Sequence, residues 1–295
     1  MSKTANIYEE VTRNLLQKME QGVIPWRRPW GNRSSAIPTN LFSRRQYRGV
    51  NVLRLMAEGR SAWWATAHQV AALGGKLQAG AKPVKVISMF MFEDTDGSDN
   101  FRSTVSEVYN LDDCDELCAP HSMVRQKMSP IESCEKFLAK LPKTMPKVSH
   151  GGKRAVYYWN EDMIKMPVKE SFDNMEQYYA TLFHEYGHST GHEDRLDREY
   201  MQLCGRGLEV RAFEELVAEL TSAFVCAQVG IAQVTDDRAA HYLKHWLKHL
   251  RSDPRELIRA AAHAQKAADY MQGIIKKVAK KKNDKNVVKL LKAAG

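Results

Sequence analysis

The sequence predicts an α+β protein with two domains. Apolar residues recur at helical spacing over 6–22, and the run VKVISMFMF at 84–92 has the composition of a strand. From Ser171 onward, helical patterns dominate the chain. Because 295 residues can support two hydrophobic cores, we place a boundary in the mixed segment 110–130. The expected units are a basic, aromatic-rich domain over 1–125, a mostly helical domain with a small β-sheet over 126–275, and a Lys-rich tail over 276–295.

The first domain is expected to mix short helices with a strand pair. Gly22 and Gly74-Gly75 stand where two of these helices would end, as glycine often does. The prolines of VIPWRRPWGNR exclude regular structure between the first helix and the second. The predicted elements are helices over 6–22, 46–58 and 66–73, and strands over 84–92 and 101–109.

The second domain is expected to be mainly helical. A short strand is predicted at RAVYYWNE, where aromatic and β-branched residues cluster. No internal repeat with a fixed period is present. The predicted elements are a strand over 154–161 and helices over 131–141, 173–189, 209–228, 236–250 and 254–275.

Composition narrows the class of protein. Hydrophobic residues make up 43% and charged residues 27%, which is typical of a globular chain. No stretch approaches the roughly 20 apolar residues that span a bilayer, and the N-terminus lacks an apolar signal-peptide core. Five cysteines at irregular spacings favour reduced thiols over a disulfide framework. We therefore expect a cytoplasmic protein with no membrane partner.

The net charge of +9 is unevenly distributed. Residues 1–90 carry 14 Lys and Arg against 4 Asp and Glu, whereas residues 91–275 carry 22 against 30. The tail over 276–295 is basic again, with 8 against 1. This asymmetry suggests that the first part binds a polyanionic partner and that the middle part has a different function. The alternative is that the charge imbalance only keeps the protein soluble.

The most specific chemical motif is His-Glu-Tyr-Gly-His at 184–188. On a helix, positions i and i+4 share one face, so His184 and His188 can hold one Zn²⁺ or another divalent transition metal. Glu185 is then placed to act as the general base toward an attacking water. We expect Gly187 to leave room beside the metal. An exposed helix with these residues on its surface is the alternative.

Two histidines need a third protein ligand. In zincins of the glutamate-ligand class this ligand lies on a second helix, often in the pattern E-x-x-A, which Glu215-Leu-Val-Ala218 matches. We choose Glu215 as the ligand and Glu219 as the acceptor for the second N–H of a ligand histidine. His192 and Asp194 are rival ligands, and the glutamates of this helix can also be read as surface charges.

The predicted strand over 154–161 precedes the metal helix. In zincins an edge strand in this place pairs with an extended peptide substrate through main-chain hydrogen bonds. An ordinary core strand is an equally good interpretation. Tyr157, Arg195 and Tyr200 are candidates to stabilise an oxyanion, and the sequence does not choose among them.

Residues 25–64 interleave arginines with aromatic residues. Arginines neutralise phosphates, and flat rings stack on unpaired bases, whose faces a duplex hides. The mixture therefore favours single-stranded DNA over duplex, although buried tryptophans are the alternative. The candidate DNA-binding residues are Trp26, Arg27, Arg28, Trp30, Arg44, Arg45, Tyr47, Arg48, Asn51, Trp63, Lys76, Lys82 and Lys85.

Together these motifs resemble ArdC-type antirestriction proteins. The runs EQGVIPWRRPW, QYRGVN and WWATAHQVAALGGKLQAGAKPVKVI resemble their N-terminal domain, and YYATLFHEYGHSTGHEDRLDRE and FEELVAELTSAFVCAQVGI are similar to their C-terminal zincin-like domain. The resemblance covers most of residues 7–275. It implies a single-stranded-DNA-binding domain joined to a metallopeptidase-like domain, in proteins of mobile elements that protect incoming DNA from host restriction.

Carried over by position, the resemblance implies His184, Glu185 and His188 as the metal motif and Glu215 as its downstream glutamate. Ser189 stands where many relatives are expected to have an aromatic residue. The acidic stretch over 93–116 and the Lys-rich tail match nothing in the family pattern. These departures concern the substrate and leave the metal unaffected.

Three functions follow from these interpretations. The first is a DNA-binding antirestriction protein with an active zinc peptidase site and a peptide or protein substrate. The second is a DNA-binding protein whose metal is structural. The third is a primase- or replication-associated accessory that binds single strands, for which antirestriction is a side effect or absent.

Overall fold

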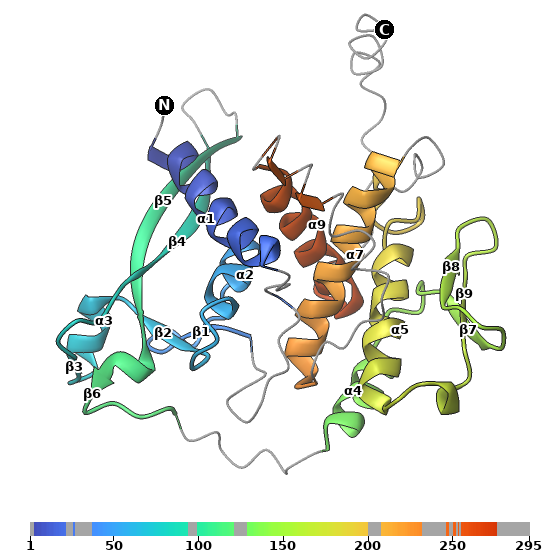
Figure 1. Cartoon of the computed structure of the whole chain (residues 1–295), viewed down its shortest axis with the longest axis horizontal. Helices are drawn as coiled ribbons and strands as arrows, with labels where there is room; N and C mark the ends of the chain where they lie inside the picture. The colour runs from blue at the N-terminus through green and yellow to red at the C-terminus, as the bar shows by residue number, and fades with distance from the viewer. Residues whose placement is uncertain are drawn as a thin grey trace, which may run out of the picture.

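The computed structural model describes residues 3–21, 26, 37–93, 99–120, 129–199, 208–231, 246–247, 250–251, 253 and 255–275. We call residues 3–120 the N-terminal half and residues 129–275 the C-terminal half. Figure 1 shows the long β4–β5 hairpin with α1 and α2 in the first, and the helices α5, α7 and α9 in the second. Within the described ranges, no helix is both long and apolar enough to cross a membrane. The predicted α+β class is confirmed.

The N-terminal half is built on a sheet of order β1-β2-β5-β4. β1 and β2 are parallel, and the other neighbours are antiparallel, with Val84 opposite Val108 at one end of the β4–β5 pair and Glu93 opposite Asp99 at the other. Its elements are α1 (Lys3–Glu20), β1 (Thr39–Asn40), α2 (Val50–Met56), β2 (Trp63–Ala65), α3 (Ala67–Ala72), β3 (Lys76–Leu77), β4 (Val84–Glu93), β5 (Asp99–Asn110), η1 (Leu111–Asp113) and β6 (Cys114–Asp115).

The C-terminal half is mainly helical, with a small sheet of order β7-β9-β8 beside α5. β7 is parallel to β9, and β8 pairs antiparallel with β9, so β8 is an edge strand. The elements are α4 (Pro130–Leu138), β7 (Lys147–His150), β8 (Val156–Tyr158), β9 (Met163–Met166), η2 (Lys169–Ser171), α5 (Met175–Ser189), α7 (Leu208–Val229) and α9 (Arg255–Met271).

Most predicted elements are confirmed, but the structure differs in several places. The helix expected over 46–58 begins only at Val50, because Gly49 before it has φ 56°, outside the helical region. The strand expected over 154–161 is shorter, and β7 and β9 beside it were not predicted. The short strands β1, β2, β3 and β6 of the N-terminal half were not predicted either. The helix expected over 236–250 falls largely outside the described residues.

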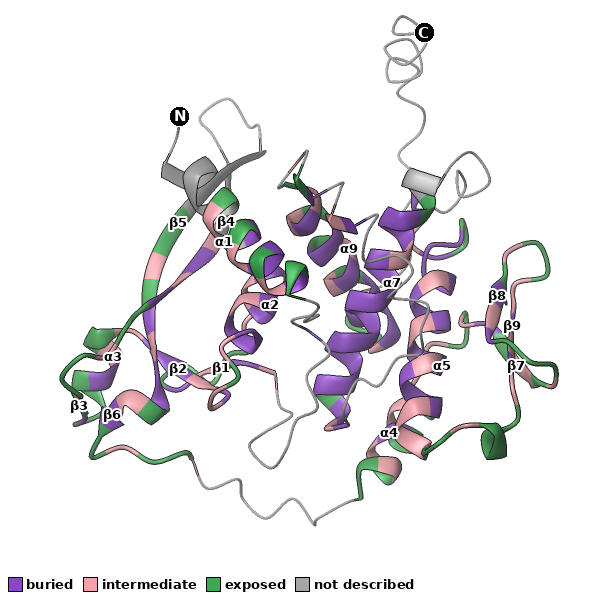
Figure 2. Cartoon of the chain, viewed as in Figure 1, coloured by how far each residue is buried: buried purple, intermediate pink, exposed green. Residues whose placement is uncertain are grey.

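The two halves share one hydrophobic core. Leu15 and Met19 of α1 and Leu53 of α2 belong to the same buried cluster as side chains of α5, α7 and α9. α7 lies between α5 and α9 and is buried along most of its described length (Figure 2). Two smaller clusters, around Leu41 and around Trp64, lie within the N-terminal half. The halves are thus packed against each other rather than merely linked.

Polar contacts also connect the two halves. Arg48, just before α2, forms an ion pair with Asp269 of α9. The backbone N–H of Gly49 donates to Gln265 Oε1 at 3.0 Å. Because both bonds end on α9, they fix the start of α2 against the C-terminal half.

Candidate metal centre

The helix α5 presents both histidines of the motif on one face. It begins after Asn174, whose side chain accepts from the backbone N–H of Gln177 and satisfies one orphan donor of the first turn. Apolar neighbours such as Leu182 and Phe183 are buried and anchor the helix in the core. His184 and His188, one turn apart, are half-buried, with their Nε2 atoms 3.1 Å from each other.

α7 crosses α5 at Gly187. A Cβ on Gly187 would lie 3.2 Å from Ala218 Cα and 3.2 Å from Thr221 Cβ, so only glycine fits without a shift. The expectation that Gly187 leaves room beside the metal is wrong, because the absence of a side chain at Gly187 makes room for the backbone of α7 instead. This close approach brings the turn of α7 that contains Glu215 next to the two histidines.

His184, His188 and Glu215 bring their ligand atoms together. Glu215 Oε2 lies 3.4 Å from His184 Nε2 and 3.6 Å from His188 Nε2. Two atoms each about 2.05 Å from one ion at a tetrahedral angle would be about 3.3 Å apart, so these separations fit a single small ion. Within the described part of the chain, this is the one group of His, Cys, Asp and Glu side chains that converges in this way.

Two further carboxylates face the other nitrogens of the histidines. Glu219 Oε2 lies 3.6 Å from His184 Nδ1, the place expected for Glu219, and Glu214 Oε1 lies 3.5 Å from His188 Nδ1. Such partners orient ligand histidines and fix their tautomers. The role of Glu214 was not predicted from the sequence.

Glu214 is in turn held by Arg198. Both side chains are almost fully buried, and the guanidinium donates to both carboxylate oxygens of Glu214. Arg198 also donates to the hydroxyl of Thr190, at 2.7 Å, and to the carbonyl oxygen of Gly187, at 2.9 Å. It therefore ties the end of α5 to α7. Sequence reasoning did not single out Arg198, because no local motif marks it.

The carboxylates control the protonation of the histidines. Burial alone would lower the pKa of His184, but Glu215 and Glu219 outweigh it and raise the pKa to about 10. Burial likewise opposes Glu214 and Glu215 at His188, whose pKa is raised to about 9. Burial would raise the pKa of Glu215, but the two histidines lower it. The site therefore concentrates negative charge around two imidazoles, as a divalent cation requires.

Glu185 is fixed by the edge strand. Its side chain is 3% exposed, and Oε2 accepts a hydrogen bond of 2.8 Å from the backbone N–H of Tyr157 on β8. The base candidate thus lies between the metal helix and an edge strand.

The oxyanion candidates have other partners. Arg195 is buried and donates to Ser189, Thr144, Asp162 and the hydroxyl of Tyr157. The Tyr157 hydroxyl donates to Asp162 at 2.7 Å. This network clamps the β8–β9 turn to the loop after α5, so both side chains serve structure here. Tyr200 lies outside the described residues.

The rival metal ligands do not join the cluster. His192 packs against Trp159, with ring centroids 4.7 Å apart and the rings tilted by 41°, and its Nδ1 accepts from the backbone N–H of Asp194 at 3.1 Å. The Asp194 side chain is largely exposed. Neither residue belongs to the convergent group.

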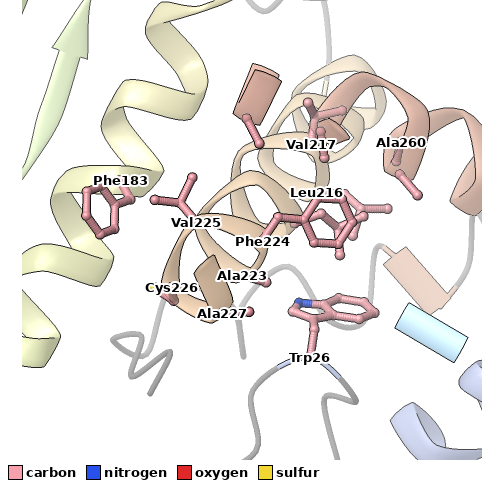
Figure 3. Close-up of a cluster of buried hydrophobic side chains, with 14 of the residues drawn as sticks. Trp26, Phe183, Leu216, Val217, Ala223, Phe224, Val225, Cys226, Ala227 and Ala260 are labelled. Carbon is pink, nitrogen blue, oxygen red and sulfur yellow. The ribbon is translucent and has the colours of Figure 1, made fainter. Parts of the chain in front are cut away.

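Two of the candidate DNA-binding residues, Trp26 and Asn51, have structural roles. Trp26 is 1% exposed and packs against Trp246 and the α7 face formed by Ala223 and Ala227 (Figure 3), so the expectation that it stacks on a base is wrong. Asn51 donates to the carbonyl oxygen of Ile87 and accepts from the N–H of Ile87, which corrects its assignment to DNA.

Tyr47 is half-buried against the core, and burial raises the pKa of its hydroxyl.

The remaining candidates lie nearer the surface. The guanidinium of Arg44 lies 5.4 Å from the ring centroid of half-buried Trp63, and Arg45 follows it in an exposed turn. Arg48 pairs with Asp269, Lys76 with Glu116 and Lys85 with Glu10. Lys82 is exposed. Arg27, Arg28 and Trp30 lie outside the described residues.

Two families match successive parts of the chain. The N-terminal domain of anti-restriction factor ArdC matches residues 5–113, and a zincin-like metallopeptidase family matches residues 132–263. The uncharacterized protein y4eC of Sinorhizobium fredii is 35% identical over 286 residues, which cover 90% of this chain and 91% of that protein. DNA primase TraC of Escherichia coli is 33% identical over 288 residues, but this chain spans only 20% of its length.

Solved structures give the same result. The crystal structure of the antirestriction protein ArdC from plasmid R388 in its metal-free form aligns with a TM-score of 0.72 at 31% identity, over 90% of this chain and 96% of that one. Its Mn(II)-bound structure aligns with a TM-score of 0.71 at 33% identity, over 90% and 97%. The similarity therefore extends over both halves and over the cluster of His184, His188 and Glu215, where a divalent metal fits.

Proposed function

This chain belongs to the family of ArdC-type antirestriction proteins, and we propose that it binds single-stranded DNA and protects the incoming DNA of a plasmid or phage from restriction in the host cytoplasm. The match of residues 5–113 to the N-terminal ArdC domain supports a DNA partner. The guanidinium of Arg44 lies over the half-buried ring of Trp63, 5.4 Å from its centroid, and this pairing of cationic and aromatic groups supports a single-stranded partner, because unpaired bases offer the faces that aromatic rings bind.

We propose further that the metal is Zn²⁺ and that the site is peptidase-like. The observation that carries this proposal is the convergence of His184, His188 and Glu215 from two helices on one point. Two nitrogens and one oxygen are a donor set that zinc accepts in catalytic sites. When bound, the ion would supply Lewis acidity toward a carbonyl oxygen.

The residues around this point have the roles that amide hydrolysis needs. Glu185 would take a proton from the attacking water and pass it to the leaving amine. Its carboxylate is held by the N–H of Tyr157, so it enters the reaction already oriented. β8 is an edge strand, and an extended peptide is the substrate that pairs with such an edge.

The test is Glu185→Gln in the full chain. The substitution keeps the size of the side chain and an acceptor for the Tyr157 N–H, but removes the base. We expect metal content and melting temperature to remain near the wild-type values, while protection of transferred DNA in a restricting host is lost. Transfer into a non-restricting host is the control. If protection survives with metal bound, proteolysis is not the mechanism.

A second candidate is a replication-associated accessory whose metal is structural. The similarity to DNA primase TraC favours it, because a segment of that protein matches almost the whole of this chain. Under this hypothesis, the protein does not change the ratio of transfer efficiency into restricting hosts to that into non-restricting hosts. His184→Ala would then lower the melting temperature, whereas Glu185→Gln would change nothing.

A further inference from the structure

The turn between β1 and Gln46 is built as a rigid projection. Thr39 and Gln46 form an antiparallel bridge, and the N–H of Asn40 donates to the carbonyl oxygen of Arg45 at 2.8 Å. Inside the turn, Asn40 Oδ1 accepts from the N–H and the hydroxyl of Ser43, at 2.8 and 3.0 Å. The turn is therefore ordered by its own hydrogen bonds before any partner binds.

Neighbouring elements brace the same turn. Asn40 Nδ2 donates to Gln69 Oε1 of α3 at 2.9 Å, and Leu41 is buried in the small cluster with Ala65 and Val70. On the other side, the Gln46 side chain reaches Gln228 of α7 at 3.4 Å. These contacts fix both ends of the turn, and residues 42–45 between them are exposed.

Two features of this turn are unfavourable for folding alone. Phe42, next to buried Leu41, is 52% exposed, so an aromatic ring is left in water. Arg44 has φ 61°, the left-handed region that non-glycine residues seldom occupy. Unfavourable features of this kind concentrate at binding sites, where the surrounding structure maintains them.

Together the exposed groups form a mixed aromatic and cationic surface. Phe42 supplies an open ring, and Arg45 is exposed beside it. The guanidinium of Arg44 lies over the ring of Trp63, 5.4 Å from its centroid, and a guanidinium in a cation–π contact has five N–H donors with which it can still bind phosphate. Rings bind bases and guanidinium groups bind phosphates, which together match a single-stranded oligonucleotide.

We propose that Phe42 stacks on an unpaired base while Arg44 and Arg45 bind the adjoining phosphates, so that this turn is a nucleotide-binding site. The inference rests on the proposed function, namely that the protein binds single-stranded DNA. Phe42 was not among the residues predicted from the sequence. Through Gln46 the site adjoins α7, the helix that contributes Glu215 to the metal centre.

The experiment measures binding of a fluorescein-labelled oligothymidine to the full chain by anisotropy. Phe42→Ala is expected to weaken binding about 5- to 150-fold, the range for loss of one stacked base, and Phe42→Trp is expected to restore it. With an abasic oligonucleotide, wild type and Phe42→Ala should bind equally. Val168→Ala is the control, because Val168 is a similarly exposed apolar residue, 47% exposed, after β9.

Arg44→Ala tests the phosphate contact separately. It should lower the slope of log affinity against log salt by about one unit. If wild type binds oligothymidine but Phe42→Ala and Arg44→Ala bind as wild type does, the proposed site is wrong and the proposed function stands. If wild type fails to bind single strands at all, both are wrong.

Discussion

Gly187 of α5 lies against the backbone of Ala218 in α7, so close that a Cβ at position 187 would lie 3.2 Å from Ala218 Cα and would require α7 to shift. The contact explains why the third ligand lies where it does. Ala218 is three residues after Glu215, less than one turn, so the point of closest approach and the ligand are neighbours on α7. The spacing of the metal centre therefore depends on a glycine that binds no metal.

Gly187→Ala should weaken metal binding. Alanine favours the helix by about 1 kcal/mol, but an added methyl in a packed interface typically costs about 1–3 kcal/mol. Because the blocking atoms include the backbone of Ala218, side-chain rotation cannot relieve the contact and α7 has to move. We expect at least about a tenfold loss of zinc affinity, measured by competition with a chelator. Unchanged affinity would show that the helices separate without cost.

Glu214→Gln should weaken metal binding as well, through His188. Loss of a carboxylate that orients a ligand histidine typically costs about 10- to 100-fold in affinity. It also leaves buried Arg198 without its partner, which for a buried pair costs about 3–5 kcal/mol of folding stability. Arg259→Gln, which breaks a more exposed pair with Glu256 on α9, is the control and should alter neither quantity measurably.

The stability of the metal-free protein should fall as pH rises. His184 and His188 have folded-state pKa values of about 10 and about 9, against about 6.5 in the unfolded chain. The contribution of the two protonated histidines to the free energy of unfolding is therefore complete below about pH 6.5 and is lost as pH rises through 9 and 10. Zinc requires neutral imidazoles, so the zinc-loaded protein should not show this loss.

Melting temperatures between about pH 6.5 and pH 10, with EDTA or with zinc, measure this effect. Because other groups titrate in the same range, the His184→Gln/His188→Gln variant in EDTA gives the background slope. A wild-type slope equal to that of the variant would contradict the prediction. At neutral pH, zinc binding should also release protons, which calorimetry in two buffers can count.

The metal ligands could be predicted because their spacing is local. His184 and His188 are one helical turn apart, and Glu215 stands in a short pattern with Ala218. Arg198 could not be predicted, because its partner Glu214 lies 16 positions away and an arginine after a helix has no distinctive pattern. The same holds for the buried clamp of Arg195 and Asp162, which only the folded chain brings together.

The fold was predictable where patterns are long. The long apolar run of β4 and the helical spacing of apolar residues in α5 and α9 were sufficient to predict these elements. β7 and β9 have four residues each, KVSH and MIKM, and lack the β-branched run that marks a strand. Trp26 misled the sequence reasoning, because a tryptophan between prolines and arginines looks solvent-exposed until Trp246, 220 positions later, covers it.

Binding to DNA should be steeply salt-dependent and stronger for single strands than for duplex. Phosphate contacts release counterions, so affinity should fall sharply between about 50 and 200 mM salt. Equal affinity for both forms at moderate salt would contradict the stacking argument. Deletion of residues 276–295, which carry 8 Lys and 1 Asp, should weaken binding without changing the preference. Anisotropy titrations at several salt concentrations decide both points.

Trp26→Ala and Trp63→Ala should separate stability from binding. Trp26 is enclosed between Trp246 and the small residues of α7, so its truncation leaves a cavity and should cost about 3–5 kcal/mol of unfolding free energy. Trp63 is only half-buried; it packs against the small cluster around Leu41, and the guanidinium of Arg44 lies over its ring. Trp63→Ala should cost less stability but weaken oligothymidine binding, because Arg44 loses the surface that positions it. Denaturant unfolding and anisotropy should be measured on both variants. A Trp26→Ala variant that is as stable as the wild type but defective in binding would contradict this division.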